Sequence, residues 1–281
     1  MMATMKRLLY VMILALLPCV GTRAQAQKGE LLNPKTLWID HGDRKIFGVL
    51  NRPLHVDGKM PIAIVSHGFN GTHHFAQDYF GPLAEKGYMV YAFDFPCGSV
   101  HSQSDSNTMN MSIVDEQGDL CAIVDYFRHQ PYVDASHIVL IGESQGGLVS
   151  ALTAAKMKGK VSQLVLIYPA LCIPDNWNKR YPRMEDIPDT TRLWDVPMGR
   201  RFFEEVKSIK VFGKIDRYKN PVLIVQGDAD AIVSMEDSRR AVEEYKNARL
   251  HVIHGAGHGF KPHERKEAIG QILSFLQTAK R

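Results

Sequence analysis

Ser144 lies in a short glycine-rich turn between a predicted strand and a predicted helix, in the sequence Gly142-Glu143-Ser144-Gln145-Gly146-Gly147. The apolar run Ile138 to Ile141 precedes this turn, and a helix-like segment follows it. A serine at such a strand-turn-helix junction is held in a strained conformation with its hydroxyl exposed, and the residues two before and two after it must be small. Gly142 and Gly146 meet this requirement. The pattern predicts a nucleophilic serine, and the alternative is a βα turn with an incidental serine.

A serine hydroxyl is a weak nucleophile, so Ser144 needs a base, and the base needs an acid that holds its tautomer and stabilises its charged form. One loop after a later predicted strand carries Asp228 and Asp230, and the loop after the last strand carries His254 and His258. We favour Asp230 because it lies further out in its loop, whereas Asp228 is suited to hydrogen-bond its own turn. We favour His258 because flanking glycines let the loop carry it towards Ser144, whereas a structural role is expected for His254 at the strand end.

A tetrahedral intermediate at Ser144 would need two hydrogen-bond donors aimed at its oxyanion. The first candidate is the backbone N–H of Gln145, and the second is the backbone N–H of Phe69, in a His67-Gly68-Phe69 turn after an earlier buried strand. His67 is therefore expected to brace the turn and not to act as the base. No spacing of histidines and cysteines in the chain matches a metal site, so the sequence predicts no metal.

Short unbroken apolar runs, typical of strands buried on both faces, alternate with helical patterns along the chain. The predicted elements are a hairpin of strands 36–40 and 46–50, buried strands at 61–65, 88–93, 138–141, 161–168, 221–225 and 250–253, and helices near 75–86, 113–129, 235–245 and 268–276. This alternation predicts an α/β fold with a mostly parallel central sheet and helices on both faces.

Residues 171–219, here called the insertion, interrupt this alternation between two predicted core strands. The insertion is rich in aromatic residues, including Trp177 and Trp194, with many charges between them. A connection of this length is unusual in a compact domain unless it is functional. We therefore predict a cap over the strand ends, where open α/β sheets bind ligands, with Trp177 and Trp194 contacting substrate. The alternative is a surface subdomain without a role in binding.

Residues 1–26 have the features of a secretory signal peptide. Lys6 and Arg7 precede the apolar run at residues 8–17, and Ala24-Gln25-Ala26 forms a small-x-small cleavage site. The apolar run is too short to span a bilayer, which takes about 20 residues. The sequence therefore predicts an exported protein, periplasmic or secreted, that is soluble after cleavage.

Residues 27–281 form one predicted domain, and the insertion lies inside it. The signal contains three basic and no acidic residues, so its removal takes the formal net charge from +4 to +1, which gives no indication of binding to nucleic acid or to an anionic membrane. Lipid attachment at Cys19 is a less favoured alternative, because Pro18 fits such a signal poorly. The three other cysteines, whose spacing fits neither a disulfide framework nor a zinc site, are Cys97, Cys121 and Cys172.

Taken in order, these motifs resemble those of the serine α/β-hydrolase superfamily over nearly the whole mature chain. In that superfamily the serine, the acid and the histidine follow one another in this order. The acid loop of the family also has the Asp-x-x-Val form found from Asp230 to Val233. The resemblance therefore implies an α/β-hydrolase fold with Ser144, Asp230 and His258 as its catalytic triad.

Within the superfamily, the chain most resembles the bacterial cinnamoyl or feruloyl esterases. The shared features are Ser-Gln-Gly-Gly at residues 144–147, Tyr168-Pro169-Ala170 after the next strand, and Ile187-Pro188-Asp189 in the insertion. Glu143 departs from the pattern, because those esterases commonly carry histidine at this place. The residues around Trp177 also do not align with those that grip the phenolic ring.

The resemblance implies a serine carboxylic ester hydrolase without a cofactor, which works through an acyl-enzyme and takes hydroxycinnamoyl esters of plant polysaccharide as substrate. Three alternatives remain open. One is a general short-chain esterase or lipase. Another is a serine peptidase of the prolyl-oligopeptidase kind, although those large peptidases usually carry an N-terminal propeller for which this chain has no room. The third is a non-catalytic binding module that keeps the fold.

Overall fold

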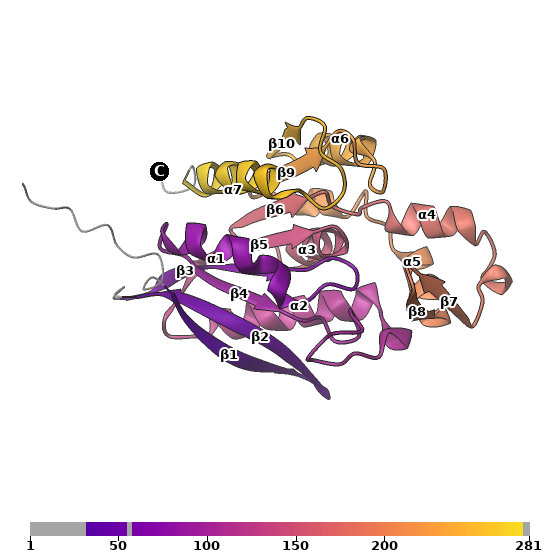
Figure 1. The fold of residues 1–281 in the computed structure, drawn as a ribbon, viewed down its shortest axis with the longest axis horizontal. Helices are drawn as coiled ribbons and strands as arrows, with labels where there is room; N and C mark the ends of the chain where they lie inside the picture. Colours follow the sequence, from indigo (N-terminus) through magenta and orange to yellow (C-terminus); the bar gives the residue numbers. More distant parts are fainter. Residues whose placement is uncertain (1–31, 55–57, 278–281) are drawn as a thin grey trace, which may run out of the picture.

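A mixed, mostly parallel sheet forms the centre of the protein (Figure 1). The computed structural model describes residues 32–54 and 58–277, and eight strands within these ranges form the sheet. In chain order they are β1 (Leu32–His41), β2 (Arg44–Pro53), β3 (Met60–Ser66), β4 (Met89–Phe93), β5 (Val133–Glu143), β6 (Gln163–Ile167), β9 (Val222–Gly227) and β10 (Ala248–Ile253). The predicted signal peptide, with Cys19, lies outside the described residues.

The strand order across the sheet is β1-β2-β4-β3-β5-β6-β9-β10. The predicted hairpin β1-β2 pairs antiparallel and places β2 antiparallel to β4, whereas every other neighbouring pair is parallel. All five residues of β4 and of β6 are buried, as expected for strands covered on both faces. The carboxyl ends of β5, β9 and β10 therefore point to the same edge of the sheet.

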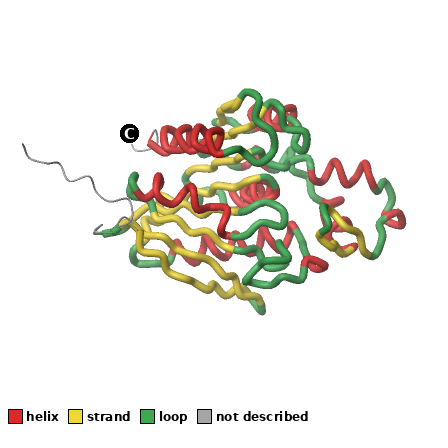
Figure 2. The backbone as a smooth tube through the Cα atoms, viewed as in Figure 1, coloured by secondary structure: helices red, strands yellow, loops and turns green. Residues whose placement is uncertain are grey.

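Helices cover both faces of the sheet, as the alternation in the sequence predicts (Figure 2). On one face lie α1 (Gln77–Ala84) and α7 (Pro262–Gln277), and on the other lie α2 (Ile113–Arg128), α3 (Gln145–Lys156) and α6 (Met235–Glu244). Neighbouring residues of β3 alternate between the faces, since Ile62 and Ile64 join the apolar cluster of α2 and α3, and Ala63 and Val65 join the cluster of α1 and α7.

The insertion forms a group of short elements at one end of the sheet (Figure 1). It contains α4 (Ile173–Arg180), α5 (Arg200–Ser208) and a small antiparallel sheet of β7 (Thr190–Leu193) and β8 (Val196–Gly199). Phe202, Phe203 and Val206 of α5 are buried in the same apolar cluster as α2 and α3. The insertion is thus packed into the main core and is not a detached appendage.

Several details complete the fold. Short 3-10 helices lie at His73–Ala76, Thr108–Asn110, Met184–Asp186 and Ile215–Arg217. The described cysteines Cys97, Cys121 and Cys172 are free thiols. Among the described helices, none combines the length and apolar character needed to cross a bilayer. The described ranges also hold no group of three or more His, Cys, Asp or Glu side chains that could bind a metal ion.

Candidate active site

Ser144 occupies the sharp turn that connects β5 to α3. Its backbone has φ 52° and ψ −118°, in the left-handed half of conformational space that residues with a side chain rarely adopt. Glycines allow the close approach that this turn needs. A Cβ on Gly142 would lie 2.3 Å from the backbone oxygen of Gly146, and a Cβ on Gly146 would lie 2.4 Å from the backbone oxygen of Ser66. The structure therefore has the strained serine turn that the sequence predicts, and strain of this kind is a frequent mark of a functional site.

The structure brings Ser144, His258 and Asp230 together from three loops. His258 Nε2 lies 3.0 Å from Ser144 Oγ, and His258 Nδ1 lies 2.8 Å from Asp230 Oδ2. With Nδ1–H donating to the carboxylate, Nε2 is left with a lone pair directed at the serine hydroxyl. This geometry lets the imidazole accept the hydroxyl proton while the carboxylate holds the ring and stabilises its positive form.

Asp230 is held by several donors besides His258. Its Oδ1 accepts hydrogen bonds from the backbone N–H groups of Ile232 and Val233 at 2.8 and 2.9 Å, and its Oδ2 accepts one from Gln226 Nε2 at 3.1 Å. The carboxylate side chain is fully buried. These bonds fix the orientation of the carboxylate and offset the cost of burying its charge.

The competing pair, Asp228 and His254, also forms a hydrogen bond, with 2.8 Å between Oδ2 and Nδ1. Its setting is different, because the His254 side chain is 87% exposed and no hydrogen bond joins it to Ser144 within the part of the chain that the structure describes. Asp228 also accepts a bond of 2.6 Å from the N–H of Gly255, and together these two partners hold the pKa of Asp228 below its ordinary value. Asp228 and His254 thus tie one loop to the other.

Both predicted oxyanion donors lie beside Ser144. Gln145 is the first residue of α3, so its N–H has no partner inside the helix and lies at the positive end of the helix dipole. The turn that carries Phe69 comes up against the serine, since a Cβ on Gly68 would lie only 3.1 Å from Ser144 Cβ. Phe69, Ser144 and Gln145 line one cavity. Two backbone donors are thus placed where an oxyanion could form.

His67 braces this turn, in line with the role that the sequence suggested. It is buried, its Nδ1 donates to the backbone oxygen of Gly68 at 2.7 Å, and its Nε2 accepts from the backbone N–H of Phe95 at 3.0 Å. Burial lowers the pKa of His67, which favours the neutral ring that this donor and acceptor pattern requires. His67 therefore joins the loop after β3 to the loop after β4.

Glu116 was not identified from the sequence, although it lies directly behind the predicted oxyanion donor. It is fully buried in α2, and Gln145 Nε2 donates to both of its carboxylate oxygens, at 2.9 and 3.0 Å. Burial raises its pKa to about 8. The sequence did contain a sign of this burial. Glu116 lies three residues after Ile113 and four before Leu120, which places it on the apolar face of that helix.

Glu143, which departs from the esterase pattern, is the centre of a second buried polar cluster. Its carboxylate accepts hydrogen bonds from Tyr79 Oη at 2.5 Å, from Arg265 Nη1 at 2.6 Å, and from the hydroxyl of Tyr168. The Tyr168 ring packs against His258, with 4.8 Å between ring centroids. The cluster ties the end of β5 to α1, α7 and the residue after β6, and it supports the histidine indirectly.

A cavity of about 180 Å³ opens beside Ser144. Trp177 and Trp194, both predicted to contact substrate, lie in its wall. Trp194 stands at the tip of the β7-β8 hairpin, 63% exposed, with its ring edge-on to Phe69 at 5.7 Å. The other residues around the cavity are Gln145, Ala170, Cys172, Ile173, Asn176, Leu193, Phe202, Ile232 and Val233. No charged side chain is among these described residues, so the cavity suits an uncharged group.

The fold and this site define a serine hydrolase of the α/β type. Comparison with known families identifies it further: the model of the prolyl oligopeptidase family matches residues 74–280. The chain belongs to this family. The match includes the Ser144 turn and both loops that carry Asp230 and His258.

Two curated relatives are peptidases by name. The uncharacterized peptidase YtmA of Bacillus subtilis (strain 168) is 22% identical over 212 residues, which cover 70% of this chain and 74% of that protein. The probable dipeptidyl-aminopeptidase B of Fusarium vanettenii is 25% identical over 271 residues, which cover 89% of this chain but only 28% of that protein. The chain therefore spans little more than a quarter of the second relative.

The similar solved structures include proteins that are not named as peptidases. Est1E from Butyrivibrio proteoclasticus, with ferulic acid bound, has a TM-score of 0.77 and 28% sequence identity, and the match covers 86% of this chain and 99% of that one. Acetyl xylan esterase 1 from Thermoanaerobacterium sp. JW/SL YS485 has a TM-score of 0.64 at 19% identity, covering 89% and 86% of the two chains. The second match shows the shared fold alone.

Proposed function

We propose that this serine hydrolase cleaves carboxylic esters of aromatic, hydroxycinnamic-type acids such as those esterified to plant polysaccharide. The observation that carries the proposal is the uncharged, aromatic wall of the cavity beside Ser144. A planar aromatic acyl group gains from contact with Trp177, Trp194 and Phe69, because aromatic rings contribute both buried area and edge-to-face contacts. The likeness to Est1E, whose structure holds ferulic acid, supports the same substrate class.

In the proposed reaction, Ser144 Oγ attacks the ester carbonyl carbon while its proton passes to His258 Nε2. The new C–O bond turns the carbonyl oxygen into an oxyanion, which accepts hydrogen bonds from the N–H groups of Gln145 and Phe69. The imidazolium, stabilised by Asp230, then protonates the leaving alkoxide as the ester bond breaks. Water attacks the acyl-enzyme with His258 again as base, which releases the acid and restores the serine.

The insertion acts as a cap in this proposal. Trp177 of α4 and Trp194 of the hairpin line the cavity together with Ser144. Gln145 cannot readily offer its side-chain amide to substrate, since Glu116 holds it. Asn176 carries the other side-chain amide around the cavity, and we propose that this amide forms a hydrogen bond with the phenolic hydroxyl of the substrate.

A peptidase is the second candidate, because the family and both curated relatives carry that description. An enzyme that removes residues from a peptide amino terminus must hold an ammonium group, and a buried ammonium needs a carboxylate partner. The residues around the cavity include no carboxylate, which favours the ester as substrate. The adjoining cavity, which shares Cys172, Asn176 and Ile232 with it, is bordered by Asp237, so an ammonium bound there would favour the peptide.

The test compares three substrates: methyl ferulate, p-nitrophenyl acetate and Gly-Pro p-nitroanilide, each with the mature protein and with Ser144→Ala. We expect kcat/KM for methyl ferulate to exceed that for the acetate, no cleavage of the anilide, and no activity in Ser144→Ala. Cleavage of the acetate alone would reduce the proposal to a general esterase. Preferred cleavage of the anilide would favour the peptidase in place of the esterase. An active Ser144→Ala variant would show that Ser144 is not the nucleophile.

We further propose that the protein is exported, on the signal-like features of residues 1–26. Cell fractionation with an antibody against the protein would test this. We expect a processed form, shorter than the full chain by about the length of the signal, in the periplasm or the medium. A membrane-bound form that requires Cys19 would instead favour lipid attachment.

A further inference from the structure

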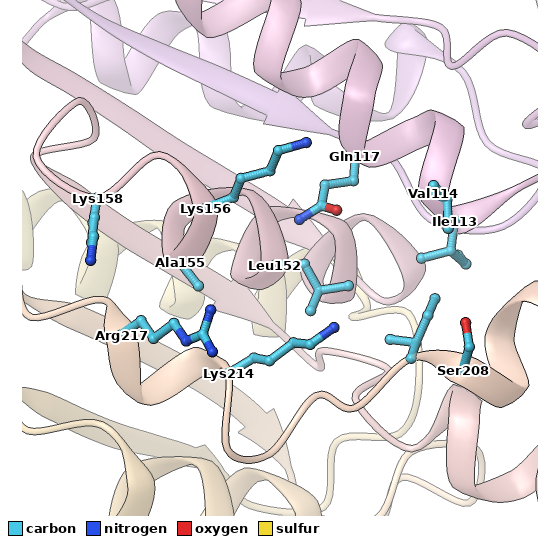
Figure 3. A pocket seen from close by; sticks show the side chains of 11 residues that line it. Ile113, Val114, Gln117, Leu152, Ala155, Lys156, Lys158, Ser208, Lys214 and Arg217 are labelled. Atoms are coloured by element: carbon cyan, nitrogen blue, oxygen red, sulfur yellow. The ribbon is translucent and has the colours of Figure 1, made fainter.

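A second cavity, of about 520 Å³, lies between α2, α3 and the end of the insertion (Figure 3). Its lining shares no residue with the cavity beside Ser144. Residues of the insertion form one wall, residues of α2 form another, and the last turn of α3 lies between them. We call it the basic groove, and its volume falls within the range of about 300 to 1,000 Å³ typical of small-molecule sites.

Four cationic side chains border the basic groove: Lys156, Lys158, Lys214 and Arg217. Within the described ranges, none of these side chains takes part in an ion pair or a hydrogen bond. Cations elsewhere are often paired, as Arg44 and Arg201 both are with Asp115. The groove therefore gathers four exposed cations, none of which pairs with an acid of the described residues.

This clustering is not explained by the needs of one helix. Lys156 lies in the last turn of α3, where a cation is favoured by the helix dipole. Lys214 and Arg217 come from the far end of the insertion, a separate segment of the chain. Bringing like charges together from separate segments costs free energy through repulsion, which water and salt reduce at these exposed side chains. An anion bound among them would relieve this repulsion.

The groove also has an apolar end. Figure 3 shows Lys158 and Arg217 towards one end, Ile113 and Val114 at the other, and Leu152 between them. Val114 is 49% exposed, so its side chain offers apolar surface to the groove. One end of the groove is thus bordered by cations, and the other carries two apolar side chains beside Gln117 and Ser208.

We propose that the basic groove binds a small amphipathic anion, with a carboxylate or phosphate group among the lysines and Arg217 and an apolar body over Leu152 and Val114. Charge complementarity selects the acidic group, and burial of the apolar body adds free energy in proportion to its area. The groove is a site separate from Ser144. It does not depend on which ester the enzyme cleaves.

Binding is measured by fluorescence titration of Ser144→Ala protein with three probes that share one ring system: 2-naphthoate, 2-naphthyl phosphate and 2-naphthylmethanol. On this background the test pair Lys214→Glu/Arg217→Glu reverses two charges of the groove. The matched control Lys86→Glu/Lys266→Glu makes the same change in net charge at exposed positions near α1 and in α7, on the opposite face of the sheet.

We expect the test pair to weaken binding of at least one acidic probe by about tenfold or more, about 1.4 kcal/mol, while the neutral alcohol and the control pair show no such loss. Comparison of naphthoate with naphthyl phosphate identifies the preferred acidic group. Unchanged affinity for both acids in the test pair would overturn the proposal. An equal loss in the control pair would do so too, because it would reduce the effect to general surface charge. Lys156→Gln/Lys158→Gln is a second test pair should the first fail to fold.

Discussion

The two His-Asp pairs of the loops after β9 and β10 show how little separates a candidate catalytic pair from a structural one. Both pairs have a contact of 2.8 Å between Nδ1 and Oδ2. They differ in surroundings, since His258 also contacts Ser144 and Asp230 is fully buried, whereas His254 is exposed. Function at the residue scale is therefore decided by the third partner and by burial, not by the pair itself.

Asp230→Asn tests this difference, with Asp228→Asn as its matched control. The amide at position 230 should favour the wrong imidazole tautomer and remove the charge that stabilises the protonated ring, so we expect kcat to fall about a thousandfold or more. Asp228→Asn should change kcat less than about threefold, because its partner is solvated and away from Ser144. Hydrolysis of p-nitrophenyl acetate measures both. Similar losses in the two variants would contradict the assignment of Asp230.

We expect Glu116 to make the stability of the protein depend on pH. Burial raises its pKa to about 8, against about 4.3 for an exposed glutamate. Between these values the unfolded chain releases a proton that the folded protein keeps. The contribution of Glu116 to the free energy of unfolding is therefore fully present below about pH 4.3 and is lost as the pH rises towards 8. Above that value the contribution no longer changes with pH. The cost is on the order of a few kcal/mol.

Glu116→Gln removes the titration and keeps an oxygen for Gln145, so the Tm of the wild type should fall relative to this variant between pH 5 and pH 8. Thermal unfolding followed by circular dichroism at several pH values measures the difference. Glu243→Gln, at an exposed glutamate of α6, is the control and should follow the wild type. A pH-independent difference between wild type and Glu116→Gln would refute this origin of the effect.

At the scale of elements, the β7-β8 hairpin holds Trp194 over the cavity. Trp194 and Asp195 form its turn with φ of 47° and 64°, left-handed values that glycine or asparagine usually supplies. An exposed tryptophan in such a turn is costly to the folded state. Its place beside Phe69 at the cavity fits the substrate contact that we propose for it.

Trp194→Ala should raise KM for methyl ferulate about fivefold to tenfold, because it removes an aromatic contact worth about 1 kcal/mol. It should leave kinetics with p-nitrophenyl acetate nearly unchanged, since a short acyl group does not reach the hairpin. Trp38→Ala, at a half-exposed tryptophan of β1 away from the cavity, is the control. Equal effects on both substrates would assign Trp194 a structural role only.

The main elements could be predicted because their signals are local. The runs at 61–65 and 221–225 became β3 and β9, and the helical spacing from Ile113 onward became α2. The small sheet β7-β8 was missed, because its turn is Trp-Asp and lacks glycine. The order of the strands in the sheet could not be predicted from the sequence either, since it depends on pairing between distant segments. The turn at Ser144 could be predicted from the two glycines that flank it. The hydrogen-bond partners of Glu116 and Glu143 could not, because these residues acquire them only through tertiary packing.

For the molecule as a whole, the question is whether the insertion is an independent unit. Phe203 of α5 is fully buried and packs on Trp177, with 4.6 Å between ring centroids. It belongs to the cluster that also contains α2, α3 and the strands β3 and β5. Since one apolar core unites the insertion with the sheet, cooperativity should extend across both.

We therefore expect the insertion and the sheet to unfold in one transition. Trp177 and Trp194 report on the insertion, and Trp38 reports on β1, so a Trp38→Phe protein excited selectively at tryptophan has fluorescence from the insertion alone. In urea, this fluorescence and the far-ultraviolet circular dichroism of the sheet and helices should give the same midpoint. Phe203→Ala should lower both midpoints together, by about 3 to 5 kcal/mol of stability, because it opens a cavity in the shared core. If fluorescence is lost at lower urea than circular dichroism, the insertion folds as a separate unit, and closure over Ser144 would then be an equilibrium of its own.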